Sequence, residues 1–298
     1  MKRPTTINDM RERSSRFATQ QGLKRGLSYL PAPTDVFISP YAKCGTTWMQ
    51  QIVHGLRTGG SMEFAEISEV VPWLELAHDM GLDAHAPQVA RPRAFKSHLG
   101  WHDIPKGGRY IVVFRDPIDA MLSLYRFLEG WWFETGSIPV SDFAAYYLDR
   151  EERDTYWAHA ASWWGERGRD DVLCLTFEDM KNNLSEAVRR VADFIGITDV
   201  AHIKIATRQA GFEFMKAHGA QFDDHLVRRA RDPACGIPPG GVASKVNRGR
   251  VGAESALVTP EIQNAFAVRW SETMAKPFGL SSYTDLRRAL SQHSDFTS

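Results

Sequence analysis

The chain is poor in cysteine, in net charge and in long apolar runs. It has 3 cysteines in 298 residues, Cys44, Cys174 and Cys235, whose spacing matches neither a disulfide framework nor a zinc site. Its 36 Lys and Arg balance its 36 Asp and Glu, so no overall field favours nucleic acid or an anionic membrane. Any site for an anion must therefore be local.

The N-terminal sequence and the apolar segments carry no targeting signal. Residues 1–16 are polar and lack the apolar core of a signal peptide, and no apolar run approaches the length of a membrane span. These features predict a cytoplasmic protein without stable membrane insertion. We expect a polar, helical N-terminal extension over residues 1–30, one main domain over 31–286 and a polar tail over 287–298.

Alternating apolar segments predict an α/β fold. Four of them have the length and composition of buried parallel strands: residues 35–39, 94–98, 109–114 and 171–177. Residues 118–128 and 184–195 have helical spacing, and Gly196 ends the second helix. The order predicts a single domain with a central parallel β-sheet flanked by helices on both faces. Ligands of such sheets bind at the carboxyl ends of the strands.

A P-loop-like segment follows the first predicted strand. The sequence PYAKCGTTW (residues 40–48) joins that strand to a helix whose first backbone N–H groups suit a phosphate. Gly45 permits close approach of the backbone, and Lys43 adds charge. The segment is not a Walker A motif, because the lysine precedes its only glycine, and Gln50 excludes a cysteine-phosphatase loop. The alternative is an ordinary helix N-terminus.

Two further segments place cations and a histidine at strand ends. Arg115 directly follows the predicted strand 109–114, and Ser123 lies two turns into the next helix. The two side chains can therefore contact one phosphate. The alternative is a surface salt bridge between Arg115 and a neighbouring aspartate. Lys96 and His98 project on one side of the predicted strand 94–98, where a histidine can serve as a general base. A metal pair of His98 with His102 is the rival interpretation.

The segments resemble, in order, motifs of the soluble, cytosolic-type sulfotransferases, which use 3′-phosphoadenosine-5′-phosphosulfate (PAPS). KCGTTW (residues 43–48) resembles the 5′-phosphosulfate loop of that family, and FKSHL (95–99) resembles its segment with the catalytic base. Arg115 and Ser123 resemble the 3′-phosphate element. NRGRVG (247–252) is similar to a C-terminal Arg-Lys-Gly-x-x-Gly element, with asparagine in place of the first arginine. The resemblance covers about residues 35 to 270.

The resemblance implies roles for individual residues. It makes His98 the general base and Lys43 and Lys96 the catalytic cations. Phe177 stands where the family has tyrosine. The implied nucleotide-binding residues are Lys43, Cys44, Gly45, Thr46, Thr47, Trp48, Arg115, Ser123, Phe177, Phe212, Asn247, Arg248 and Gly249. Trp73, His98 and Trp131 are the implied acceptor-binding residues, although both tryptophans, like Trp48, have a role in the core as an alternative.

The implied reaction moves a sulfuryl group from PAPS to a hydroxyl of a small, hydrophobic acceptor and releases 3′-phosphoadenosine-5′-phosphate (PAP). No metal is expected, because cationic side chains replace magnesium. The alternatives are a P-loop-like nucleotide-binding kinase and a catalytically silent PAPS- or PAP-binding protein. The usual dimer motif of the family is not recognisable around residues 255–264, so a homodimer is left open.

Overall fold

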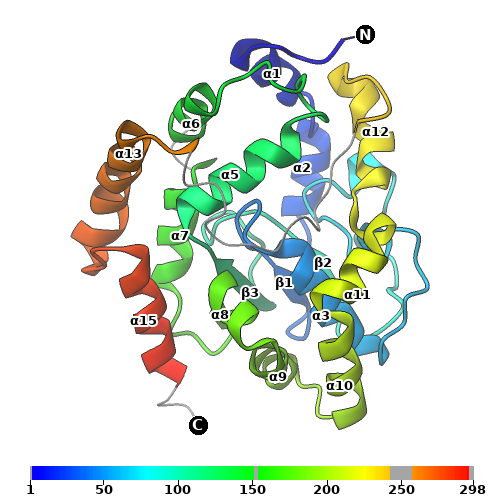
Figure 1. Ribbon diagram of the computed structural model, residues 1–298. Helices are drawn as coiled ribbons and strands as arrows, with labels where there is room; N and C mark the ends of the chain where they lie inside the picture. The colour runs from blue at the N-terminus through cyan, green and yellow to red at the C-terminus, as the bar shows by residue number, and fades with distance from the viewer. Residues whose placement is uncertain (1, 151–153, 242–256, 295–298) are drawn as a thin grey trace.

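A parallel sheet forms the centre of the computed structural model, which describes residues 2–150, 154–241 and 257–294 (Figure 1). Its 4 strands have the order β2-β1-β3-β4, and every neighbouring pair is parallel. The strands are β1 (Val36–Ile38), β2 (Ala94–Lys96), β3 (Arg109–Phe114) and β4 (Val172–Thr176). They lie within the four predicted segments, so the predicted α/β fold is confirmed.

The rest of the described chain is mainly helical. The helices are α1 (Ile7–Ser14), α2 (Gln20–Leu27), α3 (Thr46–Thr58), α4 (Ile67–Val70), α5 (Pro117–Leu128), α6 (Val140–Leu148), α7 (Tyr156–Gly165), α8 (Phe177–Asn182), α9 (Leu184–Ile195), α10 (Val200–Gln209), α11 (Phe212–Ala217), α12 (His225–Cys235), α13 (Pro260–Trp270), α14 (Lys276–Phe278) and α15 (Tyr283–Ser294). Three short elements join them: η1 (His78–Met80), η3 (Gly219–Phe222) and η5 (Ser271–Ala275). Helix α9 has the predicted bounds, and Gly196 ends it with a φ of 78°.

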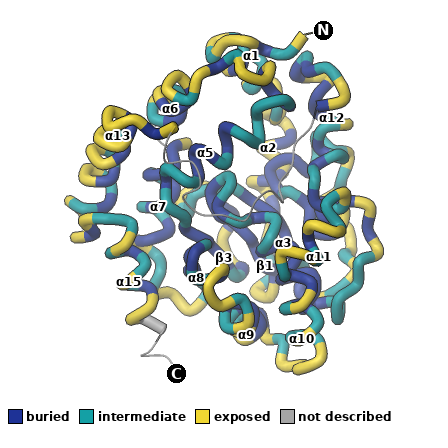
Figure 2. Tube along the Cα trace, in the orientation of Figure 1, coloured by how far each residue is buried: buried dark blue, intermediate teal, exposed yellow. Residues whose placement is uncertain are grey.

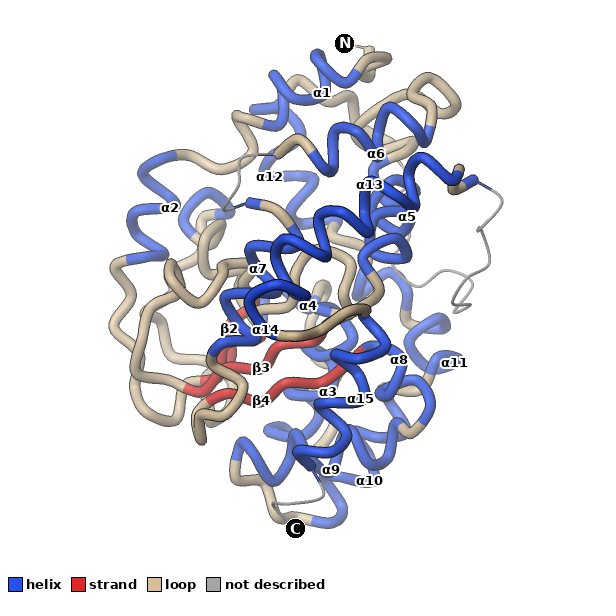
Figure 3. Tube along the Cα trace, turned by 90° about the vertical axis from the view of Figure 1, so that its left-hand side faces the viewer, coloured by secondary structure: helices blue, strands red, loops and turns tan. Residues whose placement is uncertain are grey.

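The two faces of the sheet carry different side chains. Because side chains alternate along a strand, Phe37 and Tyr110 enter one core while Ile38 and Ile111 enter the other. The first core is aromatic and is covered by α5, α6, α7 and α13; the second is aliphatic and is covered by α3, α9 and α10. Figure 3 shows the strands between these two layers, and Figure 2 shows that the strands are buried. Helices therefore cover both faces, as predicted.

The strand order fixes the place of a ligand site. From β1 the chain moves to β2 on one side and then returns to β3 on the other. The carboxyl ends of β1 and β3 are thus the point where the strand order reverses, which is where ligands of such sheets bind. The loop of residues 39–45 and Arg115 both lie at this point.

Two boundary expectations need correction. The prolines, glycines and basic residues of 228–255 predict a long irregular basic segment, but its first part belongs to helix α12, which ends at Cys235 before Gly236 with a φ of 66°. The polar tail was expected from residue 287, but α15 continues to Ser294 and buries Leu290. A helical period with apolar residues four positions apart, Leu286 and Leu290, accounts for this continuation.

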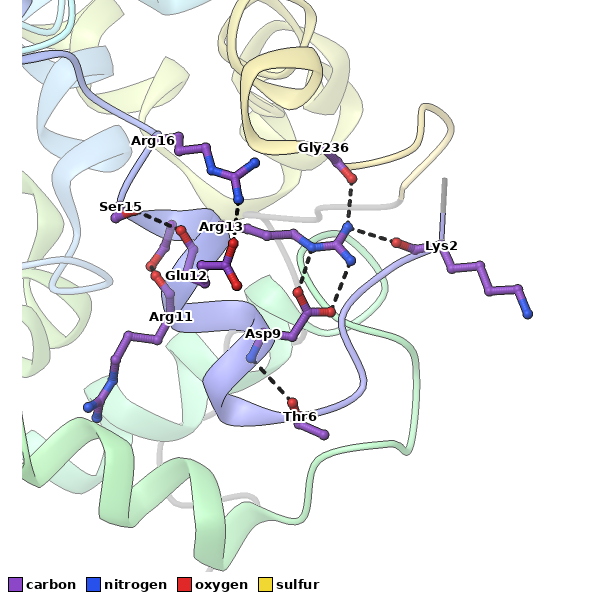
Figure 4. A network of polar contacts seen from close by, with 10 residues as sticks. Lys2, Thr6, Asp9, Arg11, Glu12, Arg13, Ser15, Arg16 and Gly236 are labelled. Atoms are coloured by element: carbon purple, nitrogen blue, oxygen red, sulfur yellow. Dashed lines mark hydrogen bonds and ion pairs between the residues drawn. The ribbon is translucent and has the colours of Figure 1, made fainter.

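The N-terminal extension is docked on the main domain (Figure 4). Arg13 of α1 donates to both carboxylate oxygens of Asp9 at 2.8 and 2.9 Å. The same guanidinium donates to the carbonyl oxygen of Gly236 at 2.7 Å, at the end of α12. Arg231 of α12 donates in turn to the carbonyl of Phe17 at 2.7 Å. These bonds hold the segment between α1 and α2 against α12.

Candidate active site

The loop between β1 and α3 has a backbone that suits an anion. Lys43 has a φ of 67° and Gly45 a φ of 99°, so two nearby residues adopt the left-handed conformation. The Cys44 amide bonds the Tyr41 carbonyl at 3.0 Å, and α3 begins directly afterwards at Thr46. A helix N-terminus after such a turn points unpaired N–H groups at one small space. A phosphate would be held mainly by the backbone here.

Two buried polar atoms beside the loop lack partners among the described residues. They are Oγ1 of Thr46, whose residue is 6% exposed, and Nε of Arg115. Arg115 donates through Nη1 to the Lys43 carbonyl at 2.8 Å, which ties the end of β3 to the loop. Buried donors without partners cost free energy unless a ligand satisfies them. The loop therefore fits a ligand rich in acceptor oxygens.

Arg115 is not held by a surface salt bridge to its neighbours. Asp116 instead caps α5, because its Oδ1 accepts from the amides of Ile118 and Asp119 at 2.9 and 3.1 Å. The Arg115 guanidinium carbon lies 4.4 Å from the centre of the Phe177 ring. Its charge is thus packed against an aromatic face, which leaves it able to attract an anion.

The two predicted catalytic lysines also lie over aromatic rings. Nζ of Lys43 is 3.9 Å from the centre of the Phe127 ring, and Nζ of Lys96 is 3.7 Å from that of Trp73. A ring face attracts a cation without neutralising its charge as a carboxylate does. Each ammonium group therefore has the face of an aromatic ring among its contacts.

Residues predicted to contact the adenosine part gather beside the loop. The rings of Trp48 and Phe177 meet edge to face with centroids 5.5 Å apart, and Trp48 Nε1 donates to the Ala210 carbonyl at 2.8 Å. A Cβ on Gly45 would come within 3.2 Å of Phe177, so glycine is also required by packing. Phe212 begins α11 and is 41% exposed. Contact of these rings with adenine stays a prediction.

The residues predicted to bind the 3′-phosphate lie partly inside and partly outside the described chain. Ser123 lies on α5, partly exposed, in the helix that follows Arg115. Asn247, Arg248 and Gly249 lie outside the described residues. The prediction for these three residues therefore stays a prediction from sequence.

The imidazole of His98 is bonded to the loop itself. Its Nδ1 lies 2.7 Å from the carbonyl oxygen of Pro40. A carbonyl only accepts, so Nδ1 carries the proton and, in the neutral ring, Nε2 carries the lone pair. This is the tautomer that a general base needs, and one hydrogen bond fixes it relative to the loop.

Glu75 positions His98 and was not predicted as a site residue. Its Oε1 accepts from the His98 amide at 2.8 Å. Burial raises the pKa of the Glu75 carboxyl, and the bond from the His98 amide partly offsets this effect. The sequence offered one signal, since Glu75 lies two residues after Trp73, an implied acceptor-binding residue.

The aromatic residues near His98 form the other wall of the site. The Trp73 ring meets the His98 ring edge to face at 5.1 Å. The centroid of the Phe17 ring lies 5.8 Å from that of Trp73 and 5.7 Å from that of Trp132. Trp131 is instead 3% exposed, and its Nε1 donates to Asp232 at 2.9 Å. The core alternative thus describes Trp131, while Phe17, from the N-terminal extension, was missed.

Cys44 is not a nucleophile despite its place in the loop. Burial raises the pKa of its thiol to about 12, so the thiolate is not available near neutral pH. Its side chain belongs to the aromatic core, with 0% exposure. The residue therefore fills space beneath the loop.

Comparison with known proteins identifies the family. The family model described as "Sulfotransferase domain" matches residues 33–276. The chain belongs to this sulfotransferase family. That confirms the predicted enzyme class, a PAPS-dependent sulfotransferase, and gives no support to the kinase alternative.

Individual proteins agree with this assignment. Sulfotransferase 4A1 of Homo sapiens is 26% identical over 82% of this chain and 81% of its own length. Mouse sulfotransferase SULT7A1, solved with PAP, has the same fold with a TM-score of 0.66 and 18% identity, over 94% of this chain and 95% of that one. Retinol dehydratase, solved with androsterone and PAP, has a TM-score of 0.68 and 19% identity, over 88% and 89%. In the part of the chain that the structure describes, none of the helices has the length and apolarity needed to cross a bilayer.

Proposed function

We propose that this sulfotransferase moves the sulfuryl group of PAPS to a hydroxyl of a small, hydrophobic acceptor and that His98 is its general base. The hydrogen bond between His98 Nδ1 and the Pro40 carbonyl, at 2.7 Å, is the observation that carries the proposal. It joins the predicted general base to the segment that would hold the phosphosulfate. Geometry comes first in assigning a base, and this geometry is favourable.

The chain's own residues divide the work of the reaction. Nε2 of His98 takes the hydroxyl proton as the acceptor oxygen bonds to sulfur, and the bond between sulfur and the 5′-phosphate oxygen breaks. Lys43 stabilises the charge left on that oxygen, and Lys96 stabilises the sulfuryl oxygens. The backbone from Lys43 to Thr46 holds the 5′-phosphate, and Arg115 with Ser123 holds the 3′-phosphate. PAP then leaves as the second product.

The acceptor is proposed from the wall opposite the loop. The Trp73 ring lies beside His98, Phe17 packs against Trp73, and the buried Trp132 packs against Phe17. Apolar pockets with few polar groups suit hydrophobic alcohols and phenols. The solved complexes of retinol dehydratase with androsterone and with retinol are consistent with this class of acceptor.

A two-part experiment tests the proposal. Thermal shifts are measured with PAP, ADP and ATP on the full chain, and a panel of hydrophobic alcohols and phenols is then screened with labelled PAPS. Selective stabilisation by PAP and label transfer to at least one acceptor are expected. An equal response to ATP argues against a 3′-phosphate site. Binding of PAP without transfer to any acceptor favours the catalytically silent alternative.

A further inference from the structure

A buried carboxylate away from the active site lacks a partner. Glu66 caps the start of α4 and has 0% exposure, yet its Oε1 has no hydrogen-bond partner among the described residues. The other oxygen, Oε2, accepts from the Leu226 amide at 2.5 Å. Leaving a carboxylate oxygen buried and unpaired is costly. Glu66 therefore needs a cation or a donor that the described residues do not supply.

Two side chains from a distant segment lie beside this carboxylate. One oxygen or nitrogen each of Glu66, Asp223 and His225 lies within 4.8 Å of the other two. Asp223 ends η3, and His225 begins α12. The side chains of His225 and Asp223 are 37% and 32% exposed, so an ion can reach the group from solvent.

Hydrogen bonds already place the histidine ring. Asp223 Oδ1 lies 2.8 Å from His225 Nδ1 and also accepts from the His225 amide at 3.1 Å. A carboxylate oxygen only accepts, so Nδ1 carries the proton and the lone pair of the neutral ring is on Nε2. A carboxylate behind an imidazole is the usual arrangement at metal-binding histidines. Arg228 bonds Asp223 Oδ2 at 3.2 Å, which fits an outer position for this aspartate.

We propose that Glu66 and His225 bind a divalent cation of the zinc type, with Asp223 orienting the imidazole. One imidazole nitrogen and one carboxylate suit zinc better than magnesium or calcium, which prefer oxygen ligands alone. Water completes the coordination on the exposed side. The site lies outside the catalytic machinery, so it is independent of the reaction itself.

The cation would link two segments that border the active site. Gln221 already donates to the carbonyls of Met62 and Phe64 at 3.0 and 2.7 Å, so the two segments lie side by side. Glu66 precedes the segment that carries Trp73, and His225 begins the helix that holds Phe17 through Arg231. A bound cation thus stabilises both aromatic supports of the acceptor wall.

Zinc titration of the chelator-treated full chain tests the site. Calorimetry should show that one equivalent of zinc binds. Cobalt bound in place of zinc should show the visible absorption that is typical of low-symmetry coordination. Calorimetry with magnesium should show no binding. Glu66→Gln and His225→Gln should weaken zinc binding about 100-fold or more, and Asp223→Asn about tenfold. Zinc should raise the Tm of the unchanged chain by a few degrees and leave that of Glu66→Gln unaffected.

His202→Gln is the matched control. His202 also lies near an aspartate, with Nε2 4.0 Å from Asp199 Oδ2, but has no third ligating group within reach among the described residues. The His202→Gln substitution should leave zinc binding unchanged. Glu66→Gln keeps the shape of the side chain and removes a buried charge, so it should stay folded, and the more exposed His225 gives a second variant. Absence of saturable zinc binding, or binding that survives both substitutions, overturns the proposal.

Discussion

The two ends of the candidate active site are built by different means. The loop end, Lys43 to Thr46 with Arg115, is shaped by backbone conformation and by a bond from Arg115 to the Lys43 carbonyl. The histidine end is assembled from side chains at the end of β2, just after it and in the segment before it: Lys96, His98, Trp73 and Glu75. The first fits a phosphate by its backbone, whereas the second depends on each side chain.

The Pro40 carbonyl is where the two ends meet. It belongs to the loop, and it accepts from His98 at 2.7 Å. The side chains of Thr46 and Arg115 should therefore govern nucleotide affinity, and those at the histidine end should govern turnover. The predictions below separate the two.

The largest effect is expected at His98. His98→Ala should reduce turnover about 10²- to 10⁴-fold, because proton removal from the acceptor then lacks its base. The affinity for PAP should change less than about twofold, because the loop backbone is retained. Turnover with labelled PAPS and calorimetry with PAP measure the two quantities. Normal turnover in this variant would show that His98 is not the general base.

Arg115→Ala, unlike His98→Ala, should act mainly on the affinity for PAP. Loss of a charged hydrogen bond to phosphate should weaken PAP binding about 10- to 100-fold. Arg109 stands at the other end of the same strand, where it bonds the Phe194 carbonyl. Arg109→Ala is therefore the control, and calorimetry should find its PAP affinity unchanged. Equal affinities in the two variants would contradict a phosphate role for Arg115.

Thr46→Val tests whether a buried hydroxyl is reserved for the ligand. Because Thr46 Oγ1 lacks a partner, valine should raise the free energy of unfolding of the free protein by about 1 kcal/mol. The same change should weaken PAP binding about five- to twentyfold, because a bond to phosphate is lost. Urea unfolding and calorimetry give the two values.

Thr58, at the other end of α3, provides the control for this pair of effects. Its hydroxyl donates to the His54 carbonyl at 2.6 Å. Thr58→Val should therefore lower stability and leave PAP affinity unchanged. If Thr46→Val behaved in the same way as Thr58→Val, the loop hydroxyl would have no ligand role.

The contrast between the ends explains what the sequence could predict. Strand, glycine and helix signals are local, so the loop, the strand and the cation at Arg115 were predicted from short windows. Lys96 and His98 were predicted from their two-residue spacing on the segment 94–98, and the family resemblance implied their roles. Phe17 was missed because its contact with Trp73 depends on how the extension docks.

Other features depended on contacts between distant segments. The pairing of Glu66 with His225 joins positions far apart in the chain, and no spacing rule connects them. Trp131 can be buried because its indole N–H donates to Asp232 on α12. The local sequence does not reveal this partner. Asp116 was weighed as an ion-pair partner of Arg115, but the first turn of α5 uses its carboxylate.

Phe127 tests the aromatic support of the loop end, with a smaller effect. Phe127→Leu removes the ring that lies 3.9 Å from Lys43 Nζ and should reduce turnover about two- to fivefold. Phe127→Tyr keeps the ring and should restore most of the loss. Initial rates at saturating acceptor measure both variants. Equal rates for Phe127→Leu and Phe127→Tyr would show that the ring face does not contribute to turnover.

A second histidine beside the loop should affect stability and not chemistry. His159 Nε2 donates to the Ser39 carbonyl at 3.1 Å, next to the carbonyl that His98 uses. Burial lowers the pKa of His159 to about 3, so the folded state keeps this ring neutral. The unfolded chain takes up a proton below about pH 6.5, so stability is complete above that pH and falls as the pH decreases toward 3.

His159→Gln should remove that part of the pH dependence. The longer glutamine amide can reach the position of Nε2 and donate to Ser39, and the loss of stability between about pH 6.5 and 4 should become shallower by up to about 1.4 kcal/mol per pH unit. Urea unfolding across this range measures the slope. Burial also lowers the pKa of His54, to about 4, so part of the slope should remain in the variant. An unchanged slope would mean that His159 is protonated in the folded protein, and the division between a catalytic and a structural histidine would fail.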